Sequence, residues 1–109
     1  DIGAEVPITY IDACVGEEID VPTRDGTVKQ IVKEGTQPAT IIRRRGRGED
    51  SLTERGRRDQ YIELTIEVPK DLNKAQKDIL RQFEAAITDK QYEKRKGFFQ
   101  KLKKFVGNE

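Results

Sequence analysis

The sequence contains no histidine and a single cysteine, Cys14. A lone cysteine cannot form a disulfide within the chain, and structural zinc sites are built mainly from cysteine and histidine. We therefore expect neither a metal nor a cofactor in this chain, and we interpret Cys14 as a small apolar core residue. Without histidine, catalysis would depend on carboxylates, lysine, tyrosine or Cys14, and these residues form no catalytic pattern here. The sequence thus predicts a protein that is not an enzyme.

Methionine is also absent, and the chain begins at Asp1. We interpret this beginning as that of a piece of a longer protein. No apolar run approaches the roughly 20 residues that cross a bilayer, and no signal peptide is visible. We therefore expect a cytoplasmic protein with no membrane partner.

Apolar residues are scarce, at 34% of the chain, whereas charged residues reach 38%. The net charge of +1 conceals a strong segregation of charge along the sequence. Residues 1–20 hold six acids and no base, whereas 43–58 hold seven arginines against three acids and 90–109 hold seven bases against two acids. We interpret these segments mainly as solvated surfaces. The alternative is an Arg-Gly loop that binds nucleic acid through phosphates, but it lacks aromatics for base stacking, so we expect no nucleic-acid partner.

Strand patterns fill the first two thirds of the chain. Alternating apolar residues predict strands that contain Val6, Ile8 and Tyr10, then Ile19 and Val21, then residues 28–32, 40–45 and 61–68. Residues 11–15 lose the alternation and predict a short helix that stops at Gly16. Asp25-Gly26 predicts a hairpin turn, and residues 46–59 predict a loop.

Helical patterns fill the rest. Asn73 and Gln76 have the spacing of a capping box, and apolar residues follow at helical intervals as far as Ile87. Gly97 is expected to break the chain before a last helix over residues 98–106. Because strands come first and helices last, we predict a mainly β fold: a small β-sandwich with a short helix after the first strand and helices at the carboxy terminus.

Short motifs follow one another in a recognisable order, although none is specific alone. They are Glu5-Val6-Pro7-Ile8-Thr9, Ile19-Asp20-Val21-Pro22-Thr23, Asp25-Gly26, Gly35-Thr36-Gln37, Arg43-Arg44-Arg45-Gly46-Arg47-Gly48, Arg57-Arg58-Asp59-Gln60-Tyr61 and Glu67-Val68-Pro69-Lys70-Asp71-Leu72. This series resembles the second carboxy-terminal domain of DnaJ-type co-chaperones. The end, from Gly97-Phe98-Phe99 to Phe105, is similar to that of bacterial members. The resemblance implies a β-rich domain over residues 1–72 and terminal helices with a dimerisation tail over 73–109.

DnaJ proteins deliver unfolded polypeptides to a DnaK-type chaperone and stimulate its ATP hydrolysis through a J domain with a His-Pro-Asp motif. This chain has no histidine, so that motif is absent. The resemblance implies a region that supports client binding and joins two protomers, with the DnaK-type partner engaged through upstream domains.

Four positions depart from the family pattern, among them Lys33, where proline is usual, and Ala39, where glycine is usual. Arg44 stands where the family usually has leucine, and Gln30 stands where it usually has an apolar residue. A buried guanidinium without a partner would be very costly. Our hypothesis is that Gln30 and Arg44 lie near each other in a partly wet polar patch.

A client chain can add to an exposed strand edge through backbone hydrogen bonds, with apolar side chains beside it. Pro7 indicates such an edge or a bulge, because proline cannot donate to a sheet ladder. Val6, Ile8 and Tyr10 are therefore candidate client-binding residues. The alternative is that these three side chains simply belong to the core.

The apolar residues of the last two helices are the candidate dimerisation surface. A short isolated helix is marginal in water, so such side chains must pack on something. A second copy, the chain's own domain and a membrane are the alternatives, and we favour a homodimer. The residues are Leu80, Phe83, Phe98, Phe99, Leu102, Phe105 and Val106.

Overall fold

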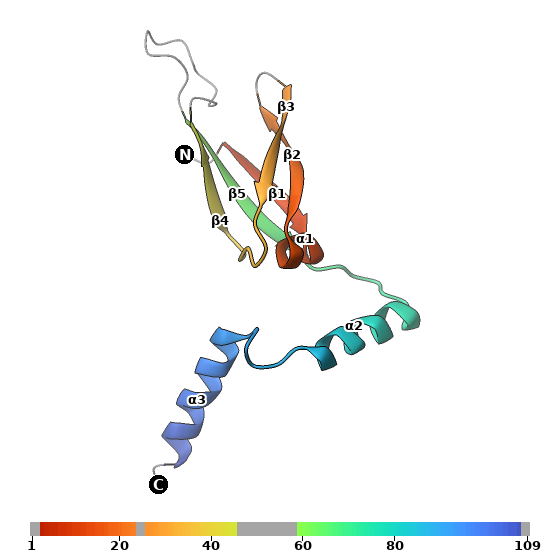
Figure 1. Cartoon of the computed structure of the whole chain (residues 1–109), viewed down its shortest axis with the longest axis vertical. Coiled ribbons are helices and arrows are strands. Elements are labelled where there is room, and N and C mark those ends of the chain that lie inside the picture. Colours follow the sequence, from red (N-terminus) through yellow and green to blue (C-terminus); the bar gives the residue numbers. More distant parts are fainter. Residues whose placement is uncertain (1–2, 24–25, 46–58, 108–109) are drawn as a thin grey trace. The chain divides into compact units, whose positions relative to one another are not determined.

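A computed structural model describes residues 3–23, 26–45 and 59–107. They form a β-rich unit that ends at Pro69 and a helical unit that begins at Lys70 (Figure 1). In chain order the elements are β1 (Ala4–Thr9), α1 (Tyr10–Val15), β2 (Glu17–Thr23), β3 (Gly26–Val32), β4 (Thr40–Arg44), β5 (Gln60–Glu67), α2 (Lys74–Ala86) and α3 (Glu93–Gly107).

The strands form two sheets. One has the order β1-β5-β4, in which β1 is parallel and β4 antiparallel to β5, with Ile8 opposite Ile66 and Ile42 opposite Ile62. The other is the antiparallel hairpin of β2 and β3, with Val21 opposite Val28. The predicted β-sandwich with a short helix after the first strand and terminal helices is confirmed.

The core of the β-rich unit lies between the two sheets. Alternate residues of each strand point inward, as the period of a pleated strand requires. The buried apolar residues come from both sheets and from α1. They are Ile8, Ala13, Val21, Val32, Ile62 and Leu64. Because each fully buried aliphatic side chain stabilises a fold by only about 1.5–3 kcal/mol, this small core makes the unit sensitive to any single loss.

The short helix α1 begins one residue earlier than the sequence predicted. Thr9 caps it, since the Thr9 hydroxyl accepts a hydrogen bond from the Asp12 N–H at 2.9 Å. Tyr10 therefore opens α1, and its predicted place in the first strand is wrong. Gly16 ends the helix at φ +84°, and an added Cβ would lie only 3.0 Å from the Glu34 nitrogen. This position requires glycine on both grounds.

The helical unit begins with the predicted capping box. The Asn73 side chain accepts from the Gln76 N–H, and the Gln76 side chain accepts from the Asn73 N–H, each at 2.8 Å. The predicted break at Gly97 is wrong, because α3 runs from Glu93 through Gly97 to Gly107. A glycine inside a helix costs only about 1 kcal/mol relative to alanine, which the flanking turns can offset.

Candidate functional site

The first candidate site is the outer edge of β1. The structure pairs β1 with β5 alone among the described strands, so β1 is an edge strand, as Pro7 indicated. The side chains proposed beside that edge point elsewhere. Ile8 is 4% exposed and belongs to the core, Val6 packs against the core, and Tyr10 lies half-buried in α1. Glu5, Pro7 and Thr9 are the exposed residues of β1, so what this edge offers a client is mainly its backbone.

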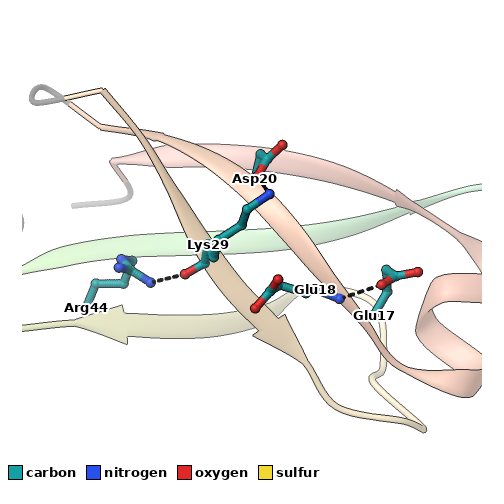
Figure 2. Close-up of polar contacts among 5 residues, drawn as sticks. All are labelled: Glu17, Glu18, Asp20, Lys29 and Arg44. Carbon is teal, nitrogen blue, oxygen red and sulfur yellow. Dashed lines mark hydrogen bonds and ion pairs between the residues drawn. The ribbon is translucent and has the colours of Figure 1, made fainter.

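The edges of the β2–β3 hairpin are less open, because side chains occupy several of their backbone groups. The Gln30 amide donates to the Ile31 carbonyl at 3.0 Å, and the Gln60 amide donates to the Pro22 carbonyl at 3.3 Å. The Glu18 N–H donates to the Glu17 carboxylate at 2.8 Å, as Figure 2 shows. Edge strands whose polar groups are engaged in this way pair less readily with another chain. The hairpin is therefore a poorer site for strand addition than β1.

Arg44 and Gln30 form the polar patch that the sequence predicted. The Arg44 Nη1 donates to the Gln30 Oε1 at 2.5 Å, in a partly buried position between β4 and β3. The same nitrogen makes a long contact of 3.4 Å with the Lys29 carbonyl of β3 (Figure 2). Opposite Arg44 on β5 lies Gln60, which is only 8% exposed. A polar layer of three side chains thus replaces apolar packing at this end of the sandwich.

Two exposed ion pairs lie near this layer. Asp59 binds the Arg43 guanidinium, with an Nε to Oδ2 distance of 2.6 Å, and this hydrogen bond raises the pKa of Arg43. Asp20 lies 2.6 Å from the Lys29 ammonium, and the hydrogen bond between them raises the pKa of Lys29 (Figure 2). Exposed pairs of this kind contribute little to stability, so both serve mainly to neutralise charge.

These contacts bear on the nucleic-acid alternative. Arg43 binds Asp59 and Arg44 binds Gln30, so two of the three consecutive arginines already have partners. The rest of the Arg-Gly segment, residues 46–58, lies outside the described residues, as does Asp25 of the predicted hairpin turn. The pairing of Arg43 with Asp59 therefore counts against phosphate binding by that residue, whereas Arg44 keeps a charge that only neutral oxygens contact.

The second candidate site is the apolar surface of the helical unit. Neither α2 nor α3 contains a buried residue. At helical spacing, Phe98, Leu102, Phe105 and Val106 share one face of α3 and Phe99 lies beside them. Phe98 is 60% exposed and Phe105 82%. Phe98 meets Phe99 edge to face at a centroid distance of 5.2 Å, and the Arg95 guanidinium lies 4.7 Å from the Phe99 ring centre. On α2, Leu80 and Phe83 are partly exposed, by 38% and 42%.

Some exposed apolar residues were not singled out in the sequence. They are Ile11 and Val15 on α1, Ile31 on β3, Ile41 on β4 and Val68 after β5. The spacing of Ile11 and Val15 by four residues would have placed them on one helical face. Ile31 and Ile41 have the strand parity opposite to their buried neighbours, which would have placed them outside. None of the helices in the described ranges is long and apolar enough to span a bilayer.

Comparison with known proteins agrees with this architecture. Residues 1–69 match the family model described as DnaJ C terminal domain, and residues 75–105 match the model described as Chaperone protein DnaJ C-terminal region. Among the relatives, Chaperone protein DnaJ of Acetivibrio thermocellus is 47% identical over 107 residues, which cover 98% of this chain and 28% of that protein.

Two further relatives carry the same name. Chaperone protein DnaJ of Ruminiclostridium cellulolyticum is 48% identical over 94% of this chain, and that of Clostridioides difficile is 44% identical over 94%. The chain spans 27% of the length of each. The matching regions follow the β-rich unit and the helical unit in turn. The chain therefore belongs to the DnaJ family of chaperone proteins, as a carboxy-terminal domain followed by the family's carboxy-terminal region.

Proposed function

We propose that this chain is a non-enzymatic co-chaperone region that supports the binding of unfolded polypeptides and joins two copies of the protein. The β-rich unit would contact the client, and the helical unit would form the homodimer. A DnaK-type chaperone would receive the client in the cytoplasm, engaged through parts of the longer DnaJ relatives that this chain does not span. The chaperone names of the relatives support this proposal.

The exposed apolar face of α3 is the observation that carries the proposal. Five large apolar side chains lie on or beside one face of a helix with no buried residue. Gln100 and Lys104 lie on the opposite side at helical spacing and Lys101 borders the apolar face, so the helix has one face suited to burial and one suited to water. Large exposed apolar patches mark interaction sites. A second copy is the favoured partner, because an identical apolar face would satisfy both helices at once.

Light scattering over a concentration series tests the dimer. The variant Phe98→Ala with Leu102→Ala should weaken the dimer constant about tenfold or more, because the few side chains that anchor an interface each cost more than about 1 kcal/mol when truncated. The matched control, Gln100→Ala with Lys104→Ala, changes the other side of the same helix and should leave the constant nearly unchanged. An unaltered dimer constant in the apolar variant would refute the assignment of this face.

Photocrosslinking tests client binding at the β1 edge. A photoreactive residue at the exposed position Glu5 should label an unfolded client, whereas the same residue at Thr27 on β3 should label it weakly. The reason is that the Gln60 amide occupies the carbonyl of Pro22, which pairs with Thr27, and Arg44 contacts the carbonyl of Lys29. Equal labelling at both positions would show that the β1 edge is not the preferred contact.

A further inference from the structure

The charge of Arg44 meets only neutral acceptors among the described residues. Its Nη1 binds the Gln30 amide oxygen and makes a long contact with the Lys29 carbonyl. Its Nε is enclosed and has no hydrogen-bond partner. None of the ion pairs between described residues includes Arg44, whereas neighbouring Arg43 is neutralised by Asp59. A guanidinium held in this way binds a carboxylate more strongly than the neutral oxygens that it now contacts.

Arg44 also faces an open pocket. This pocket, of about 280 Å³, is lined by Gln30, Ile42, Arg43, Arg44 and Arg45. No acidic side chain is among the lining residues. Ile42 supplies an apolar wall against which the methylene groups of a long side chain could pack. Four of the five lining residues are polar or charged, so the pocket suits an anionic group better than an apolar one.

A second unmatched polar group lies on the neighbouring strand. The Gln60 Oε1 is buried without a partner, and Gln60 stands opposite Arg44 in the β4–β5 register. Buried polar atoms without partners are rare in folded proteins, and each costs about 1–3 kcal/mol. A core built only for stability would place apolar residues here. This polar layer therefore costs stability, which a ligand that engages the Arg44 guanidinium would offset, although Gln60 Oε1, itself an acceptor, would gain no bond from a carboxylate.

We propose that the pocket beside Arg44 binds the carboxylate of an acidic side chain in a bound polypeptide. The proposal rests on the proposed function for its ligand, since an unfolded client supplies the acidic side chain. The carboxylate accepts hydrogen bonds from the Arg44 Nη groups, and the side-chain methylenes contact Ile42. This site lies between β3 and β4 and is separate from the β1 edge. It makes the β-rich unit prefer client segments in which acidic residues stand among apolar ones.

The test uses the full chain and two fluorescent peptides with amidated carboxy termini. Both contain the same apolar residues, and they differ in one glutamate that is replaced by glutamine. The glutamate peptide should bind about tenfold more tightly by anisotropy, the size expected for one charge-assisted hydrogen bond. The preference should vanish in Arg44→Leu and persist in Arg81→Leu, a matched loss of charge on α2. Arg44→Gln provides a second variant, in case leucine perturbs folding.

Side-chain NMR gives a readout that is independent of the variants. The glutamate peptide should shift the Arg44 Nε–H resonance in the unaltered chain, and the glutamine peptide should shift it less. Equal affinity for both peptides, or a preference that survives in both Arg44 variants, would overturn the carboxylate site while client binding stands. If neither peptide bound, the proposed client function itself would fail, and the site with it.

Discussion

Replacing the polar patch by apolar residues should leave the fold intact or strengthen it. The perturbation is a double-mutant cycle of Gln30→Val and Arg44→Leu, two inward-facing residues of β3 and β4 that share one hydrogen bond of 2.5 Å. Each single change leaves one partner without its main contact. The double change removes both polar groups together and lets the end of the sandwich pack on Ile42, which already contacts the core.

The magnitudes favour the double variant over either single one. The lost hydrogen bond has a charged donor and contributes about 1.5–3 kcal/mol to stability. Replacing Arg44 also removes its enclosed Nε, and burying that unpaired group costs the present fold about 1–3 kcal/mol. Added apolar burial stabilises the fold further, at about 25 cal/mol per Å². We therefore expect the double variant to be between unchanged and about 2 kcal/mol more stable, as for other buried polar groups replaced by well-packed apolar ones. The coupling energy should be about 1–2 kcal/mol.

Urea unfolding of the full chain, monitored by the circular dichroism of the β-rich unit, gives the free energy of unfolding of the unaltered chain, of both single variants and of the double variant. A control cycle of Gln30→Val with Arg43→Leu should show coupling within about 0.5 kcal/mol, because Arg43 binds Asp59 instead. A double variant that is less stable than the unaltered chain by more than about 1 kcal/mol, or a cycle with additive effects, would refute this reasoning.

The remaining predictions concern the core, the helix stop and the tail. In urea unfolding, Ile62→Ala should lower the free energy of unfolding by about 2–5 kcal/mol, because Ile62 is 0% exposed. Ile41 is 55% exposed, so Ile41→Ala should lower it by less than about 0.5 kcal/mol. Gly16→Ala should cost about 1–3 kcal/mol by the same assay, since φ is +84° and the Glu34 nitrogen is close. The thermal midpoint of the helical signal should rise with protein concentration while that of the sheet signal stays constant; a common shift would contradict this.

The alternation of apolar residues was enough to predict most of the β-rich unit. Val21, Val32 and Leu64 occupy the buried parity of their strands, and Pro7 indicated the edge strand correctly. Alternation does not report which strands pair, so the parallel pairing of β1 with β5 could not be predicted from it. That pairing joins residues more than fifty positions apart, and it depends on how the whole sandwich closes.

Local competition explains the two boundaries that were wrong. Tyr10 fits the strand period, but the Thr9 cap offers the Asp12 N–H a partner and starts the helix there. Gly97 was expected to break the chain, yet α3 includes it and runs on to Gly107. The Gln30–Arg44 pair, by contrast, could be predicted, because burying a guanidinium without a polar partner costs a large amount of free energy.

The apolar residues of the chain divide into two sets with different consequences. Every buried apolar residue in the described ranges lies between Ile8 and Leu64, so folding of the β-rich unit accounts for that set. The apolar residues of α2 and α3 are not buried, so the described chain gains little free energy from them. A sequence that keeps five large apolar residues near one face of a marginal helix gains from them only when a partner covers that face. The stability of the helical unit should therefore depend on assembly with a second copy, whereas the stability of the β-rich unit should depend on the single chain alone.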